Sequence, residues 1–312
     1  MIVFGPIPSR RLGRSLGVNN IPPKHCNYSC IYCQLGLTNR MVSKRREFYS
    51  PDVIFREAEN KIKKLKTAGE KIDYITFVPD GEPTLDINLG IEIKKLKRFG
   101  NKVAVVTNSS LIYDKHVRND LEAADLVSLK IDSVYSNIWR KINRPHGSLE
   151  LQYIFEGMLE FASGFKGELI TETMLVKGIN DSLESIYKTA EFIRKLNPAK
   201  AYILVPTRPP AEGNVKAPNE YNLNSAFRVF NNFSINTEKL VHYEGTDFTF
   251  SSEAEKELLS ILAVHPMRKD AVVQFVKKAC VDNGFLSSLI ESKNIKEVKH
   301  NNNIYYVKSI RR

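Results

Sequence analysis

The residues of this chain that are best suited to chemistry are three cysteines near its beginning. Cys26, Cys30 and Cys33 are three of only four cysteines in 312 residues, and they follow one another at spacings of four and three. Three thiolates on one short loop can bind three irons of a [4Fe-4S] cube, whereas a cube held entirely by protein normally takes four thiolates. The fourth iron is then open to a small molecule. The spacing therefore predicts an iron-sulfur centre with one free coordination position.

Two simpler interpretations of the cysteine loop are a structural zinc site and disulfide bonds. Zinc usually takes four ligands in two pairs, and the nearby candidate for a fourth, His25, is adjacent to a cysteine and poorly placed to complete a tetrahedron. Disulfides would leave one of three clustered cysteines unpaired, and no signal peptide indicates an oxidising compartment. The sequence of the loop, taken by itself, leaves a zinc site open as an alternative. The fourth cysteine, Cys280, lies among apolar residues and is predicted to be a buried thiol.

Length and composition predict a folded protein with one large α/β domain and a small one, because 42% of the 312 residues are hydrophobic. No apolar run approaches the roughly 20 residues that span a bilayer, and residues 1–6 lack the charged-then-apolar order of a signal. We therefore expect a cytoplasmic protein with no membrane contact. The net charge of +11 favours a polyanionic partner such as RNA only weakly, because the basic residues are spread along the whole chain.

Short β-rich runs alternate with amphipathic segments along most of the chain. This alternation indicates βαβ units around a parallel sheet, in which chemistry lies at the C-terminal ends of the strands. Residues 4–24 are predicted to form loops around one short strand, and their arginines either face solvent or line a site for an anionic substrate. The six predicted strands span about residues 15–19, 73–79, 102–107, 126–131, 168–176 and 201–205.

The C-x-x-x-C-x-x-C spacing, with Tyr32 directly before the third cysteine, resembles the signature of the radical S-adenosylmethionine (radical SAM) superfamily. The resemblance implies a partial (β/α)6 TIM-like barrel, which six strands match. It implies that Cys26, Cys30 and Cys33 hold a [4Fe-4S] cluster whose open iron takes the amino and carboxylate groups of SAM. An electron from the cluster then cleaves SAM to a 5′-deoxyadenosyl radical. The partner implied for this step is an external one-electron reductant, a flavodoxin-like or ferredoxin-like protein.

Several strand ends carry motifs that resemble the superfamily's SAM-binding motifs. Gly-Glu-Pro after the second strand resembles the motif that receives the SAM ammonium group, and Thr-Asn-Ser after the third resembles a T-N-G motif. A lysine in the fourth strand is implied to meet the SAM carboxylate, since a buried ammonium is costly without an anion. Turn chemistry and core packing also explain these residues individually. The SAM-binding residues implied in this way are Tyr32, Gly81, Glu82, Pro83, Thr107, Asn108, Ser109, Lys130, Asp132 and, along the adenine of SAM, Val176, Gly178 and Val205.

The resemblance covers about residues 1–245, and residues 4–17 are most similar to a mostly uncharacterised radical SAM group related to the tRNA wyosine synthases. Those synthases have additional upstream cysteines for a second cluster, and no cysteine precedes Cys26 here. Wyosine synthesis is therefore not implied. Transfer RNA, another nucleic acid or a protein stays open as the substrate.

The last part of the chain, residues 248–312, is predicted to be a separate winged helix-turn-helix domain behind a barrel of residues 1–247. Three helical segments are followed by a hairpin at about residues 295–308. A recognition helix should present Arg, Lys, Asn or Gln to base edges, but the third helix offers mainly Ser287, Ser288 and Glu291. Docking of a nucleic-acid or protein substrate is therefore at least as good an interpretation as reading DNA.

Two functions follow from these patterns. The first is an enzyme that reductively cleaves SAM and abstracts hydrogen from an unidentified substrate. The sequence assigns no catalytic residues to this enzyme. The alternative is an iron-sulfur regulator that binds nucleic acid without turnover. Formation of 5′-deoxyadenosine from SAM by the reduced protein distinguishes the two.

Overall fold

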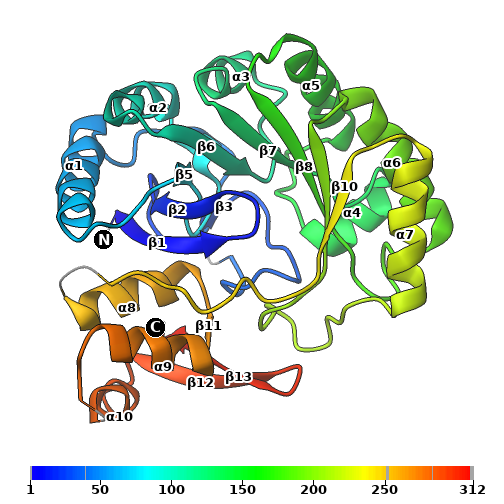
Figure 1. Ribbon diagram of the computed structural model, residues 1–312. Helices are drawn as coiled ribbons and strands as arrows, with labels where there is room; N and C mark the ends of the chain where they lie inside the picture. The colour runs from blue at the N-terminus through cyan, green and yellow to red at the C-terminus, as the bar shows by residue number, and fades with distance from the viewer. Residues whose placement is uncertain (1, 39, 251–252, 283, 310–312) are drawn as a thin grey trace.

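The computed structural model describes residues 2–38, 40–250, 253–282 and 284–309, and its largest feature is an eight-stranded sheet curled into an open half-barrel (Figure 1). Adjacent strands follow the order β1-β2-β5-β6-β7-β8-β9-β10, in which β1 is antiparallel to β2 and the others are parallel. The strands are β1 (Val3–Ser9), β2 (Gly13–Val18), β5 (Tyr74–Phe77), β6 (Lys102–Thr107), β7 (Leu126–Lys130), β8 (Glu168–Met174), β9 (Lys200–Leu204) and β10 (Thr237–Leu240).

Helices cover the outer face of the half-barrel (Figure 1). They alternate with the strands, so each crossover returns the chain to the same edge of the sheet and all parallel strands end on one side. The helices are α1 (Pro51–Thr67), α2 (Leu89–Leu96), α3 (Lys115–Leu121), α4 (Ser136–Asn143), α5 (Leu151–Gly164), α6 (Leu183–Leu196) and α7 (Glu220–Asn232), with 3-10 turns η1 (Pro83–Leu85) and η2 (Lys97–Phe99).

The six predicted strands are confirmed as β2 and β5 to β9, but the expectation of a loop over residues 4 to 9 was wrong. Strand β1 contains Pro6 and Pro8, which suggested irregular structure from the sequence. Because β1 is at the edge of the sheet, a residue without a backbone N–H is tolerated there. Helix α4 was also missed, since it is short and lacks a side-chain hydrogen bond at its N-terminus.

Helix α1 shows how local sequence sets the outer layer. Ser50 accepts a hydrogen bond from the backbone N–H of Asp52, and Pro51 occupies the first helical turn, where its missing N–H costs nothing. Ile54, Ala58, Ile62 and Leu65 recur at helical spacing and are buried, while the opposite face is charged. Each large apolar side chain buried in this way contributes about 1.5–3 kcal/mol.

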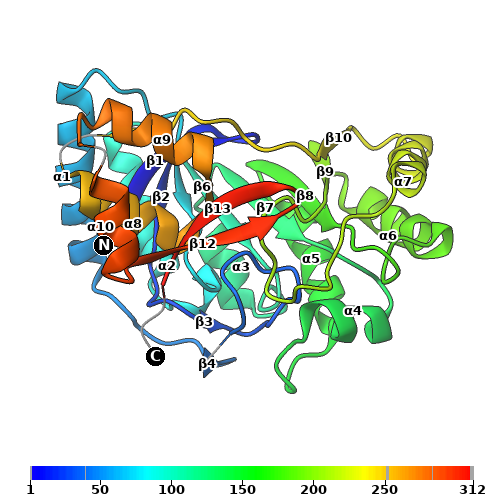
Figure 2. The same cartoon turned by 90° about the horizontal axis from the view of Figure 1, so that it is seen from below.

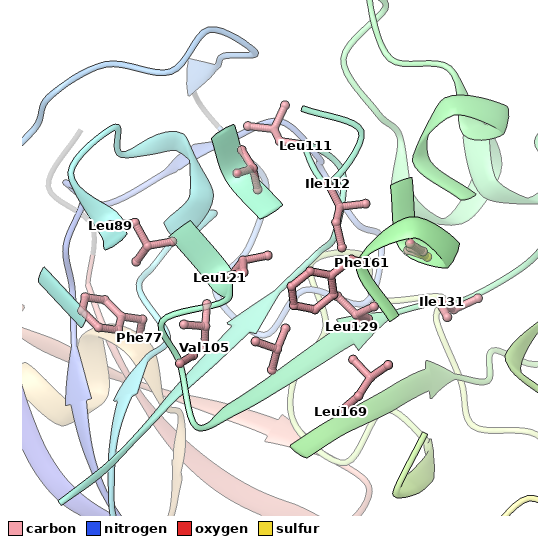
Figure 3. Close-up of a cluster of buried hydrophobic side chains, with 14 of the residues drawn as sticks. Phe77, Leu89, Val105, Leu111, Ile112, Leu121, Leu129, Ile131, Phe161 and Leu169 are labelled. Atoms are coloured by element: carbon pink, nitrogen blue, oxygen red, sulfur yellow. The ribbon is translucent and has the colours of Figure 1, made fainter. Parts of the chain in front are cut away.

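The main hydrophobic core lies between the sheet and the outer helices (Figure 3). Phe77, Val105 and Leu129 come from neighbouring parallel strands, and Leu121 and Phe161 come from α3 and α5. A smaller apolar cluster occupies the opposite face of the strands. Both faces of the parallel sheet are therefore covered, as its continuous apolar strands require.

The C-terminal residues form a unit with its own core, which includes Phe248, Leu258 and Phe275. It lies against the open side of the half-barrel, and its hairpin extends across that side (Figure 2). Tyr305 in the hairpin donates a 2.8 Å hydrogen bond to the carbonyl of Thr207. Its elements are α8 (Ala254–Val264), β11 (Met267–Arg268), α9 (Lys269–Lys278), α10 (Gly284–Glu291), β12 (Ile295–His300) and β13 (Asn303–Lys308), and its antiparallel sheet has the order β11-β13-β12.

Cys280 is exposed, so the prediction of a buried thiol was wrong. It follows the end of α9 in the left-handed conformation, with φ of 51°, as chains commonly do when a helix ends. Among the residues that the structure describes, no helix combines the length and apolar character required to cross a membrane.

We predict that Glu92→Gln stabilises the fold at alkaline pH. Glu92 in α2 is fully buried, and burial, followed by the nearby Asp86, raises its pKa to about 9. Between its unfolded value of 4.5 and this folded value, the folded chain holds a proton that the unfolded chain releases. Rising pH therefore lowers the free energy of unfolding by up to about 1.4 kcal/mol per pH unit through this group.

Urea unfolding of both proteins at about pH 5 and about pH 8 measures the effect, because the substituted chain should lose this share of the pH dependence. Glu122→Gln, at an exposed glutamate just beyond α3, is the matched control. An unchanged pH dependence in Glu92→Gln would show that Glu92 does not bind a proton in the folded state.

Candidate functional site

The cysteine loop is held by backbone hydrogen bonds on two sides. It follows β3 (His25–Cys26), which pairs with β4 (Arg40–Met41). On one side the carbonyl of His25 accepts a 3.0 Å hydrogen bond from the backbone N–H of Glu82, just after β5. On the other side the N–H groups of Ser29 and Ile31 bond to the end of α4, each at 3.0 Å. The loop is therefore fixed between the second parallel strand and a helix that follows the fourth.

Side-chain amides donate hydrogen bonds to two of the three sulfurs. Asn108 Nδ2 lies 3.6 Å from Cys26 Sγ, and Asn143 Nδ2 lies 3.4 Å from Cys30 Sγ. The backbone N–H of Tyr28 also donates to Cys26 Sγ, at 3.4 Å. Such donors stabilise negative charge on a thiolate and tune the reduction potential of any metal centre that the thiolate binds.

Burial raises the pKa of all three thiols, and that of Cys30 reaches about 12, with the nearby carboxylate of Asp132 as the next cause. At neutral pH the thiols therefore stay protonated unless a cation replaces their protons. A cluster with positively charged irons would do so, and its binding would release these protons.

The donor set fits a [4Fe-4S] cube. Within the described ranges, no three or more His, Cys, Asp or Glu side chains form a group that could hold one metal ion. A cube makes a different demand, because each thiolate binds a different iron and the sulfurs need not converge on one point. His25, which the zinc alternative requires as its fourth ligand, has its ring buried against Phe48 and its Nδ1 3.1 Å from the carbonyl of Pro22.

Glu82 connects the ends of β5 and β6. Its Oε1 accepts hydrogen bonds of 2.6 Å from the hydroxyls of Thr84 and Thr107, and its Oε2 accepts one of 2.7 Å from the backbone N–H of Asn108. Burial raises the pKa of Glu82, and these donors oppose that shift. The predicted residues Glu82, Thr107 and Asn108 are thus brought together, with the carboxylate held in one orientation.

Gly81 is required by the close approach of the cysteine loop. A Cβ at this position would lie 2.0 Å from the carbonyl oxygen of His25, so any side chain would displace the loop. Asp80, which stands where the related motif has its first glycine, forms an ion pair of 3.3 Å with Lys24. The carbonyl of Pro83 accepts a 3.1 Å hydrogen bond from buried Asn20, which holds the turn from the other side.

Ser109 adopts the left-handed conformation, with φ of 67°, which accounts for glycine at this place in the related T-N-G motif. Its hydroxyl accepts a 2.9 Å hydrogen bond from the backbone N–H of Lys130 and so joins β6 to β7. The amide of Asn108 reaches the cysteine loop, where it donates to Asn27 Oδ1 at 2.8 Å. The third-strand motif therefore supports the loop directly.

Lys130 lies between two carboxylates of the chain, and its Nζ is 3.9 Å from both Asp132 and Glu172. The ammonium is also 5.2 Å from the ring centroid of Tyr32. The sequence reasoning considered only the SAM carboxylate as an anion for Lys130, whereas the fold supplies two carboxylates of its own. Its contact with SAM stays a prediction. The hydroxyl of Tyr32 donates to Asp132, so the aromatic residue of the cysteine motif is tied to the fourth strand end.

The residues implied to lie along adenine are less closely connected. Val176 is buried and packs in one apolar cluster with Ile31 of the cysteine loop. Gly178 has φ of 70° and donates its N–H to Asp181 Oδ1 at 2.7 Å, which closes the turn after β8. Val205 is a buried residue directly after β9. The roles of these three toward adenine stay predictions.

Comparison with known proteins gives the family. The model of the Radical SAM superfamily matches residues 20–193. The chain belongs to the radical SAM superfamily. It is 46% identical over 312 residues to the UPF0026 protein MJ1312 of Methanocaldococcus jannaschii. The match covers 99% of this chain and 97% of that relative.

Solved radical SAM structures show the same fold at low identity. Streptococcus suis SuiB bound to its precursor peptide SuiA superposes with a TM-score of 0.53 at 13% identity, over 72% of this chain and 48% of that one. A radical SAM methyltransferase from Sphaerobacter thermophilus superposes with a TM-score of 0.51 at 12% identity, over 73% and 66%. At these identities the similarity concerns the fold alone.

Sequence reasoning missed one residue that forms hydrogen bonds with three residues of this radical SAM site. Asn143, the last residue of α4, donates to Cys30 Sγ, to Tyr32 at 3.2 Å and to Asp132 at 2.7 Å. Its helix was not predicted, so nothing in the pattern placed Asn143 beside the cysteines.

We predict that Gly81→Ala disturbs the cysteine loop more than it disturbs the fold. The added methyl group meets a backbone oxygen at 2.0 Å, and such overpacking typically costs about 1–3 kcal/mol. Iron and sulfide content after anaerobic reconstitution should fall, while far-ultraviolet circular dichroism stays unchanged.

Gly164→Ala at the end of α5 is the control, because a Cβ there meets no atom within 4 Å. Full iron loading of Gly81→Ala would show that the loop can move away without losing its ligands.

Proposed function

We propose that this protein is a radical SAM enzyme in which Cys26, Cys30 and Cys33 hold a [4Fe-4S] cluster and the neighbouring strand ends bind SAM. The observation that carries the proposal is the thiol-bearing loop itself, fixed on two sides, with amide donors beside two sulfurs. When bound, the cluster supplies the electron that cleaves SAM to a 5′-deoxyadenosyl radical, which abstracts hydrogen from the substrate.

The residues of the chain have separate tasks in this proposal. Glu82 already accepts hydrogen bonds from two threonine hydroxyls and a backbone N–H, so it fixes the turn whose backbone meets the SAM ammonium group. Lys130 offers a partly buried cation to the SAM carboxylate, and Asp132 orients it from 3.9 Å away. Val176 gives adenine an apolar surface.

For the C-terminal unit we propose a winged helix-turn-helix that docks substrate or closes the barrel rather than reads DNA. Three helices and an antiparallel sheet in the order β11-β13-β12 support this fold assignment. The third helix, α10, exposes Ser287, Ser288 and Glu291, none of which is a cation. The hairpin contacts the barrel through Tyr305, which supports a role at the opening of the barrel. These observations favour the enzyme over a DNA-binding regulator.

The electron comes from a separate protein in this proposal, a flavodoxin-like or ferredoxin-like reductant. The structure describes no cysteines other than Cys26, Cys30, Cys33 and Cys280, and the last lies outside the loop. An external donor therefore has to approach the cluster loop. The substrate, whether nucleic acid or protein, is a separate question from this step.

We predict that the reduced, reconstituted protein converts SAM to 5′-deoxyadenosine and methionine, and that Cys26→Ala, Cys30→Ala and Cys33→Ala each abolish this conversion. Each substitution removes one of three thiolates that a site-differentiated cube requires. Chromatography of the products and the iron content of each variant give the readouts.

Cys280→Ala is the matched control, because this exposed thiol lies in the C-terminal unit and its loss should leave iron content and SAM cleavage unchanged. An intact, SAM-binding cluster that never yields 5′-deoxyadenosine would contradict the enzyme and favour an iron-sulfur regulator.

A further inference from the structure

Three arginines gather on the open side of the half-barrel, outside the proposed SAM site. Arg10 and Arg11 occupy the turn between β1 and β2, and Arg208 lies in the loop after β9. Arg10 donates to the carbonyl of His242, two residues before the Glu244 that pairs with Arg208, and burial, followed by the charge of Arg208, lowers the pKa of Arg10. Segments about 200 residues apart in the chain therefore bring like charges together.

The carboxylates beside this cluster are fewer than the arginines. Arg11 Nε lies 3.2 Å from Glu172, which is also 3.9 Å from Lys130, and Arg208 pairs with Glu244. Although burial opposes it, Arg11 and Lys130 hold the pKa of Glu172 below its ordinary value. Both glutamates are thus ionised and already shared, Glu172 between two cations and Glu244 between Arg208 and a histidine.

The histidine beside Glu244 belongs to the C-terminal unit. His265, at the end of α8, donates to Glu244, and burial followed by the charge of Arg208 lowers its pKa. Glu244 connects the barrel to the C-terminal unit in this way. Gln34, next to the third cysteine, extends the connection, because it accepts a 2.6 Å hydrogen bond from Arg208 and donates one of 3.0 Å to the carbonyl of Val264.

Arg10 is the cation with the weakest compensation. The hydrogen bond that its guanidinium makes goes to a neutral acceptor, the backbone carbonyl of His242. Burial, followed by the charge of Arg208, lowers its pKa to about 10. Clustered guanidinium groups in a partly dry site are costly unless an anion joins them.

Two of the arginines also keep buried N–H groups without a hydrogen bond. Arg208 Nε has no hydrogen-bond partner among the described residues, and Arg11 Nε, although near Glu172, does not point its N–H at that carboxylate. Buried donors of this kind are rarely left unsatisfied in a folded protein. A guanidinium group also presents its donors in a planar fork that matches an oxyanion with two oxygens.

We propose that Arg10, Arg11 and Arg208 form a binding site for an oxyanion group, phosphate or carboxylate, of the substrate. This assignment rests on the proposed function, and it narrows the substrate class to molecules that carry such a group. Glu172 places the site beside Lys130, so an oxyanion held by the arginines sets the rest of the molecule toward the proposed SAM site. Arg208 also contacts the C-terminal unit through Glu244 and His265.

Titration calorimetry of the reconstituted full-length chain tests the site, with SAM present and no reductant, so that the SAM site is occupied and no turnover occurs. Inorganic phosphate and succinate are the two probes. Arg10→Gln and Arg208→Gln should each weaken binding by about tenfold, as expected when a charged hydrogen bond is removed. Arg10→Lys keeps the charge but not the fork, and it should give a smaller loss.

The matched control is Arg14→Gln. Arg14 lies on the same hairpin and its Nε also lacks a hydrogen-bond partner, but its terminal nitrogens are paired with Glu70 and Asp247 and donate to Thr249 at 2.7 Å. Binding by this variant should stay within about twofold of the unsubstituted chain. Thermal unfolding of every variant separates loss of the site from loss of the fold, and Arg10→Lys remains informative if Arg10→Gln does not fold.

The probe that binds more tightly shows whether the site prefers a phosphate or a carboxylate group. Saturable binding that Arg10→Gln weakens and Arg14→Gln spares supports the site. Absence of saturable binding of both probes, or an equal loss in Arg14→Gln, overturns it. The result is independent of SAM cleavage: a chain that binds phosphate as predicted but forms no 5′-deoxyadenosine loses the proposed enzyme activity and keeps the oxyanion site.

Discussion

The site depends on one buried carboxylate. Glu82 joins the ends of two parallel strands through Thr107 and Asn108, and its own backbone N–H bonds to the carbonyl of His25 at the start of the cysteine loop. Hydrogen bonds to a buried charged group are stronger than those between neutral groups, and a lost partner would leave the charge uncompensated. The orientation of the thiols, of the Gly-Glu-Pro turn and of the third strand end is therefore set together.

The parallel sheet explains why these residues meet at all. Each crossover returns the chain to the same edge, so residues separated by about 25 positions in sequence become neighbours at successive strand ends. The same geometry leaves a half-barrel open on one side. The C-terminal unit lies against that opening (Figure 2), and its contacts with Gln34 and Thr207 connect it to the cysteine loop and to the last barrel loop. A domain expected only to recruit substrate thus also borders the site.

Electrostatics divides the interior into two regions. Near the cysteines, burial raises the pKa of the thiols, and side-chain amides donate hydrogen bonds to two of the three sulfurs. Farther along the open side, arginines outnumber the carboxylates beside them. Lys130 and Glu172 lie between the two regions. This division suits a reaction in which SAM and a second, anionic molecule are held side by side.

The sequence by itself indicated the superfamily, the clustering of three cysteines in one short loop and the six parallel strands. These depend on local signals, namely spacing within eight residues, apolar periodicity and turn residues, which do not require knowledge of distant partners. It did not determine strand β1, helix α4 or the exposure of Cys280, because edge position and the path of the chain after a helix decide these. Only the tertiary structure placed Asn143 beside Cys30 and gathered Arg10, Arg11 and Arg208, since side chains far apart in sequence meet through long-range packing that no local pattern encodes.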